Sequence, residues 1–86
     1  MIILAMDLGK FNSMCCFYDT DTQEYRFQAV ATTRPYLTTV FTQDKIDLVV
    51  MEACGPSGWI CDLCQECELK TLVCSTNDAA WIWKSV

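Results

Sequence analysis

One segment sets the architecture of this chain: VVMEACGPSGW, residues 49–59. It continues an apolar run that begins at Ile46 and is aliphatic apart from Asp47, as expected of a strand buried on both faces. Glu52 follows this strand at its carboxyl end, and the next four residues can open a helix with Pro56 at its first position. A carboxylate at the end of a buried strand lies where α/β sheets usually build functional sites, although a solvated glutamate gives the same pattern.

A second carboxylate occupies a matching position near the amino terminus. Residues 2–6 are a continuous apolar run of strand length, and Asp7 ends that run. Gly9 then supplies the turn that leads onward. The two acids come together in space if their strands are parallel neighbours in one sheet.

Hydrophobic periodicity predicts three strands followed by alternating helices and strands. We expect strands at 2–6, 13–18, 24–31, 46–51 and 71–74, and helices at 33–44, at 57–69 and from 79 onward. The alternation is clearest in residues 24–31, which favours a half-exposed antiparallel strand towards a sheet edge. The order β-β-β-α-β-α-β predicts a single α/β domain over residues 1–86, with a ribonuclease-H-like mixed sheet that is truncated. In such a sheet the first strand lies beside the fourth.

That arrangement predicts a metal site at Asp7 and Glu52. Neighbouring strands lie about 4.8 Å apart, so the two carboxylates could share a divalent cation such as Mg²⁺, which relieves their mutual repulsion. A two-metal site needs more oxygen ligands than two side chains supply, so the pair resembles half of one. The alternative is two unrelated acids at strand ends.

Composition limits what else the chain can do. It has 86 residues, a hydrophobic share of 52% and a net charge of −5, which describe one small folded domain without the basic surface that nonspecific nucleic-acid binding needs. The apolar run at the amino terminus is too short for a signal peptide, and no apolar run reaches the ~18 residues of a membrane span. We therefore expect a cytoplasmic protein.

The seven cysteines are predicted to be reduced side chains that pack in the core. Cys61, Cys64 and Cys67 have a spacing similar to that of iron–sulfur ligands, but no fourth cysteine follows at the usual interval. Cys64 and Cys67 fit the apolar stripe of the helix expected at 57–69, with Cys61 at its border, which favours packing. The absence of histidine excludes Cys/His zinc sites and Ser-His-Asp triads within this chain.

Three blocks of the sequence, taken together, resemble one family. They are MDLGK at 6–10, VMEACGPSGW at 50–59 and LVCSTNDAAW at 72–81. They are similar, in the same order, to the amino-terminal part of the DEDD-type transposases of bacterial insertion sequences, whose catalytic domain is like that of the RuvC Holliday-junction resolvase. The resemblance implies Mg²⁺-dependent DNA strand cleavage and exchange. It also implies that Asp7 and Glu52 are the first two of four catalytic, metal-binding acids.

The chain departs from this family by ending early. The last two family acids, the basic helix that carries them and the domain with a catalytic serine lie beyond the matching blocks, and Ser57 does not match that serine. One hypothesis is therefore a truncated catalytic domain that is inactive alone and binds DNA weakly or not at all. The other is a non-catalytic binding or regulatory protein of the same fold.

Two further features suggest partners. Asp7-Leu8-Gly9-Lys10 resembles the phosphate loop of actin-like kinases, so a kinase fragment that binds a nucleotide near Gly9 and Lys10 is an alternative. Trp81 and Trp83 lie in a very apolar stretch close to Val86. Because exposing several large apolar side chains is unfavourable, we expect a homodimer that hides them.

Overall fold

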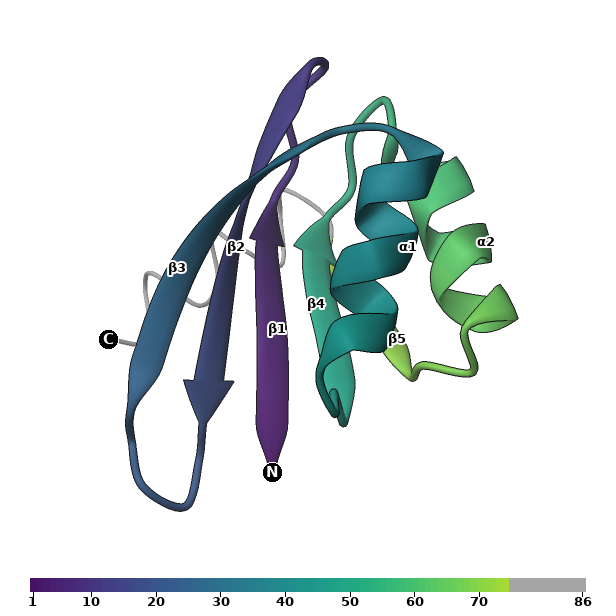
Figure 1. Cartoon of the computed structure of the whole chain (residues 1–86). Helices are drawn as coiled ribbons and strands as arrows, with labels where there is room; N and C mark the ends of the chain where they lie inside the picture. The colour runs from purple at the N-terminus through teal and green to yellow at the C-terminus, as the bar shows by residue number, and fades with distance from the viewer. Residues whose placement is uncertain (75–86) are drawn as a thin grey trace.

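Five strands form one mixed sheet in the computed structural model, which describes residues 1–74 (Figure 1). They are β1 (Ile2–Asp7), β2 (Asn12–Asp19), β3 (Tyr25–Ala31), β4 (Leu48–Glu52) and β5 (Thr71–Cys74). Their order across the sheet is β3-β2-β1-β4-β5. β1, β2 and β3 form an antiparallel meander, whereas β4 and β5 run parallel to β1. The predicted element order and the α/β class are therefore confirmed for these residues.

Two helices, α1 (Arg34–Gln43) and α2 (Ser57–Glu66), cover one face of the sheet (Figure 1). Each buries one stripe of apolar residues against the strands, as the periodicity predicts. The buried positions are Leu37, Val40 and Phe41 on α1 and Ile60, Leu63 and Cys64 on α2. Neither of these ten-residue helices has the length and apolar character needed to cross a membrane.

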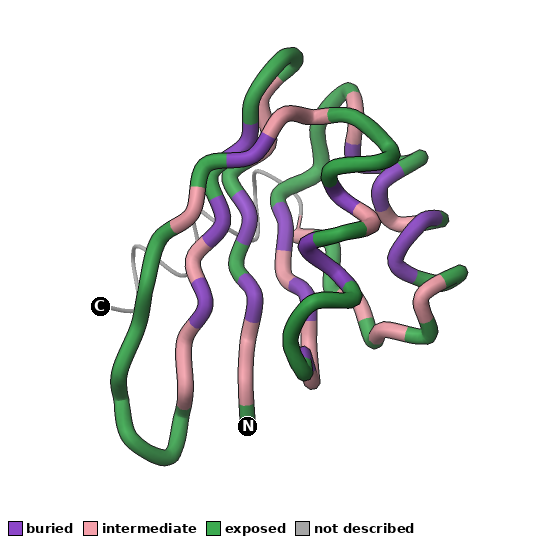
Figure 2. The backbone as a smooth tube through the Cα atoms, viewed as in Figure 1, coloured by how far each residue is buried: buried purple, intermediate pink, exposed green. Residues whose placement is uncertain are grey.

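The alternation along β1 decides which face Asp7 occupies. Leu4 and Met6 are buried beneath the helices, whereas Ala5 and Asp7 are exposed on the opposite face. Figure 2 shows the resulting alternation of burial along the central strands. β4 repeats this pattern, because Val49 and Met51 are buried and Glu52 is exposed. We call the side of the sheet that neither α1 nor α2 covers the open face (Figure 1).

The edge strand β3 turns its polar side chains towards the helical layer. Arg26 stacks on the ring of Phe17 at 4.0 Å and pairs with Asp44, which follows α1. The alternate residues of β3 lie on the open face, where Tyr25 and Phe27 are 65% and 64% exposed. The predicted alternation and edge position are correct, and the large aromatic side chains lie away from the core.

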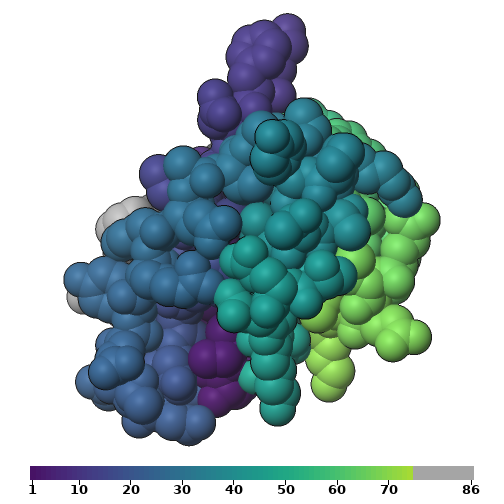
Figure 3. Space-filling view, in the orientation of Figure 1, coloured from purple at the N-terminus to yellow at the C-terminus, as the bar shows by residue number. Residues whose placement is uncertain are grey.

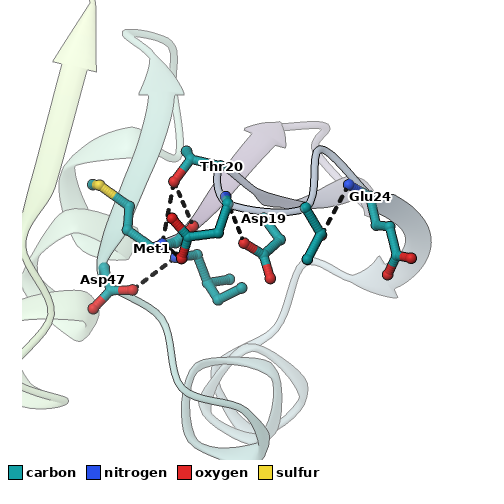
Figure 4. A network of polar contacts seen from close by, with 8 residues as sticks. Met1, Asp19, Thr20, Glu24 and Asp47 are labelled. Atoms are coloured by element: carbon teal, nitrogen blue, oxygen red, sulfur yellow. Dashed lines mark hydrogen bonds and ion pairs between the residues drawn. The ribbon is translucent and has the colours of Figure 1, made fainter.

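Two element boundaries differ from the prediction by two residues or more. β4 begins at Leu48, because Ile46 is buried within the preceding turn and Asp47 is held by its own hydrogen bonds. The Asp47 carboxylate accepts a hydrogen bond from the Ile2 N–H at 2.7 Å (Figure 4), and the Asp47 N–H donates to the Ile2 carbonyl at 2.8 Å. The Asp47 side chain thus accepts the Ile2 N–H, in place of a backbone carbonyl that would extend β4 towards Ile46.

The helix predicted for 57–69 ends earlier, at Glu66. Glu68 has a φ of 60°, the left-handed conformation that ends a helix. The Leu69 N–H donates to the Cys64 carbonyl and the Glu68 N–H to the Gln65 carbonyl, which is the Schellman arrangement. The helix predicted from residue 79, with Trp81 and Trp83, lies outside the described residues.

Candidate carboxylate site at the end of the sheet

Asp7 and Glu52 are adjacent at the carboxyl ends of two parallel neighbours. β1 and β4 pair in register from Ile3 opposite Leu48 to Met6 opposite Met51, so the next position on each strand carries an acid. That register sets the two Cα atoms about one strand spacing apart, about 4.8 Å. Both side chains are exposed on the open face. The structure therefore brings together the two acids that the sequence singles out.

The two acids stand in a row that crosses four strands. Asp7 lies opposite Met14 of β2, and Glu52 lies opposite Cys74 of β5. A hollow of about 440 Å³ adjoins this row on the open face. Its lining is otherwise mostly apolar and includes Ala5, Cys16, Phe27 and Val50. The carboxylates thus border an apolar surface that is open on one side.

No protein cation neutralises this pair within residues 1–74. The ion pairs found there join the Met1 ammonium to Asp21, Arg26 to Asp44 and Arg34 to Glu66. The same residues contain no group of three or more His, Cys, Asp or Glu arranged to hold a metal. Two carboxylates suit a hard divalent cation but supply only part of the six or more oxygen ligands that Mg²⁺ or Ca²⁺ takes. The pair therefore fits a metal that completes its coordination with water, substrate or other protein groups.

The turn after Asp7 is held rigidly by a close backbone approach. A Cβ atom at Gly9 would lie 2.2 Å from the carbonyl oxygen of Asn12, so this position accommodates only glycine in the present turn. The Gly9 N–H donates to the Ser13 hydroxyl at 3.3 Å, and the Ser13 and Thr32 hydroxyls are hydrogen-bonded at 2.7 Å. The sequence indicates the turn at Gly9 but not the hydroxyl pair. The one available signal is that Ser13 falls in phase with the buried residues of β2.

The loop after Glu52 is fixed by a local hydroxyl bridge. The Ser57 hydroxyl accepts a hydrogen bond from the Cys54 N–H at 3.1 Å and donates one to the Cys54 carbonyl at 2.8 Å. Pro56 is the residue before α2 and not its first residue, one position from the prediction. Ser57 thus shapes the start of the helix and has no contact with the acids that would make it a nucleophile.

All seven cysteines are free thiols, but only Cys15 and Cys64 are buried, and the prediction of core packing is wrong for Cys54, which is exposed. Burial raises the pKa of Cys15 to about 11. Burial also raises the pKa of Cys64 to about 12, with smaller contributions from the neighbouring thiols Cys61 and Cys67. A thiol with a raised pKa is a poor metal ligand and a poor nucleophile, because both roles need the thiolate. This chemistry favours packing over metal binding for Cys64.

No family model matches this chain, and no curated protein matches it.

Proposed function

We propose that this chain is the amino-terminal part of a DEDD-type transposase catalytic domain with a ribonuclease-H-like, RuvC-like fold. The observation that supports this proposal is the register of β1 and β4, which makes Asp7 and Glu52 adjacent. A central strand with an antiparallel neighbour on one side and a parallel neighbour on the other is compatible with that fold. The proposed reaction is Mg²⁺-dependent cleavage and exchange of DNA strands in transposition, in the cytoplasm.

In this proposal Asp7 and Glu52 bind the cation through carboxylate oxygens on the open face. A bound Mg²⁺ supplies Lewis-acid stabilisation of the oxygens that attack and leave phosphorus. The protein contributes the positions of the two acids, which the strand register fixes before any metal binds. Because the family uses four acids, the chain alone is expected to bind metal weakly and to be inactive or nearly so.

The test is a calorimetric titration with Mn²⁺ and Mg²⁺. We expect weak binding that Asp7→Asn and Glu52→Gln each reduce by at least tenfold, since each removes half of the protein ligands. Asp62→Asn is the matched control, because Asp62 is an exposed acid on α2. Metal binding that survives both site substitutions, or that Asp62→Asn weakens equally, contradicts the proposal.

The second candidate is a non-catalytic binding or regulatory protein of the same fold. The net charge of −5 favours it, because a duplex phosphate backbone repels such a surface. Both candidates predict poor duplex binding at physiological salt. Both also predict that the purified chain does not nick a supercoiled plasmid; metal-dependent nicking that Asp7→Asn abolishes would contradict this expectation and reject the purely regulatory protein.

We also propose a homodimer. Large apolar side chains on the open face support it, since Phe27 is 64% and Leu72 50% exposed, and their burial removes apolar surface from water. Trp81, which first suggested this association, lies outside the described residues. Light scattering at micromolar concentration should give the mass of two chains, and Trp81→Ala should weaken the association. A monomer in both samples rejects the dimer.

A further inference from the structure

A second cleft lies at the same end of the sheet as the two acids. It has a volume of about 470 Å³ and is lined by Lys10 and Thr32 on one side and by Gly55, Pro56 and Trp59 on the other. The β1–β2 turn and the residue after β3 form one wall, and the β4–α2 loop and the first turn of α2 form the other. Both loops leave the sheet at the end where β1 and β4 finish (Figure 1). We call it the Lys10–Trp59 cleft.

The first wall is preorganised by contacts already described at Gly9 and Ser13. The Thr32 N–H also donates to the Phe11 carbonyl at 2.8 Å, which ties the tip of the turn to the end of β3. The turn projects beyond the neighbouring surface (Figure 3), and Phe11 is 74% exposed. The Lys10 ammonium lies 5.4 Å from the centre of the Phe11 ring. Lys10 thus brings a cation to this wall, and Phe11 lies beside it without lining the cleft.

The second wall presents another aromatic side chain. Trp59 lies in the first turn of α2 and is 37% exposed, although tryptophan is usually well buried in a folded domain. The hydroxyl bridge between Ser57 and Cys54 fixes the loop that carries it. An exposed indole on a fixed helix start is a rigid platform that loses little entropy when a flat ligand stacks on it.

The charge in the cleft selects an anion. Lys10 takes part in none of the ion pairs found in residues 1–74, so its ammonium has no protein carboxylate to neutralise it there. A phosphate is a common partner for such a group. Aromatic faces beside a free cation match a nucleotide, whose base stacks and whose phosphate pairs with the ammonium. A base inside a duplex has no free face to offer, so an unpaired segment fits better.

We propose that the Lys10–Trp59 cleft binds an unpaired nucleotide of a DNA strand, with the base stacked on Trp59 and a phosphate at Lys10. This inference rests on the proposed function, because it supplies the strand contact next to Asp7 and Glu52. It gives the acidic chain a local site for single-stranded substrate in spite of its net charge.

The first experiment uses Trp59 as the reporter. The chain has three tryptophans, so the Trp81→Phe/Trp83→Phe variant carries Trp59 alone. Titration with a deoxythymidine decamer, in buffer with EDTA, should quench its fluorescence. The matching duplex and ATP should quench it at least tenfold less effectively at equal concentration. Quenching by ATP as strong as that by the decamer overturns the strand assignment in favour of a mononucleotide site.

The second experiment measures affinity with a labelled decamer by fluorescence anisotropy. Trp59→Ala should weaken binding about 5- to 150-fold, the range for loss of one stacked base, whereas Trp59→Phe should retain most of it. Lys10→Ala should reduce the slope of log affinity against log salt by about 0.7, the value for one phosphate of a single strand. Circular dichroism confirms that each variant is folded.

Matched controls come from residues that do not line the cleft. Tyr36→Ala removes an aromatic residue that is 62% exposed on α1, and Lys45→Ala removes a lysine beyond the end of α1. Both should bind the decamer within twofold of the unchanged chain. Equal losses in Tyr36→Ala and Trp59→Ala, or no binding by any protein, overturn the inference.

The metal-site proposal and the cleft proposal can each be rejected without rejecting the other. Decamer binding is measured in EDTA, so it needs no metal and is independent of the metal titration. Loss of the metal titration with intact, Trp59-dependent strand binding rejects the proposed metal site alone. If metal binding needs Asp7 and Glu52 but strand binding does not depend on Trp59, the cleft proposal alone is rejected.

Discussion

At the scale of single residues, Gly9 has a role that its sequence context only partly reveals. A turn is evident from the residues around it, but the contact with the Asn12 carbonyl follows from the folded hairpin. We expect Gly9→Ala to lower the free energy of unfolding by about 1–3 kcal/mol, the usual cost of an overpacked site, as measured by urea denaturation. Gly58→Ala is the control, since its Cβ meets nothing within 4 Å and alanine favours a helix. A loss at Gly58 as large as that at Gly9 contradicts this account.

The buried thiols make stability depend on alkaline pH. Burial raises the pKa of Cys15 from 9.0 to about 11 and that of Cys64 from 9.0 to about 12, so both stay neutral in the folded chain while the unfolded chain ionises. Their contribution to stability is complete below about pH 9 and is lost as the pH rises towards 11–12. Urea denaturation at pH 8 and at pH 10.5 should show a lower unfolding free energy at the higher pH.

Alkylation of the native chain tests independently which cysteines are buried. Cys54 is exposed and should react with iodoacetamide much faster than Cys64 at pH 8, as followed by mass spectrometry of digested protein. Urea should remove the difference. Equal rates in the native chain, or iron or a disulfide in the purified protein, contradict the packing account of these cysteines.

At the scale of elements, the end of α2 shows where periodicity stops being informative. Leu69 packs against the core and so continues the apolar pattern after the helix has ended. The left-handed residue is Glu68, which gives no glycine signal in the sequence. The sequence pattern places the start of β4 two residues too early for a similar reason, because Ile46 is buried without being in a strand. Apolar pattern reports burial, and the local backbone decides whether a buried residue belongs to an element.

The same helix end gives a prediction. Glu68→Gly should raise the unfolding free energy by about 0.5–1 kcal/mol, because glycine adopts a positive φ without steric cost. Glu66→Gly is the control: it lies inside α2 and pairs with Arg34, so glycine there should destabilise the chain. Thermal unfolding followed by circular dichroism ranks the two variants. A lower midpoint for Glu68→Gly contradicts the prediction.

At the scale of the whole molecule, the sheet order explains why the acids were predictable and the cleft was not. Asp7 and Glu52 each end an apolar strand, and one topological assumption makes those strands neighbours. The Lys10–Trp59 cleft joins a turn to a helix start, and its walls depend on hydroxyl contacts that have no periodic signature. Pairings within regular structure can be read from sequence pattern, whereas contacts between loops require the folded chain.

The position of β1 also has a kinetic consequence. The meander closes through short hairpins, but β1 meets β4 only when Ile3 finds Leu48, a partner far along the chain. Loop-closure entropy makes such distant pairing late in refolding. The two acids therefore first approach each other in that late step, and their like charges oppose it. In stopped-flow refolding with EDTA, Glu52→Gln should fold faster or unfold more slowly than the unchanged chain, and Mg²⁺ should narrow the gap. The carboxylate pair would then slow the assembly of the sheet that holds it.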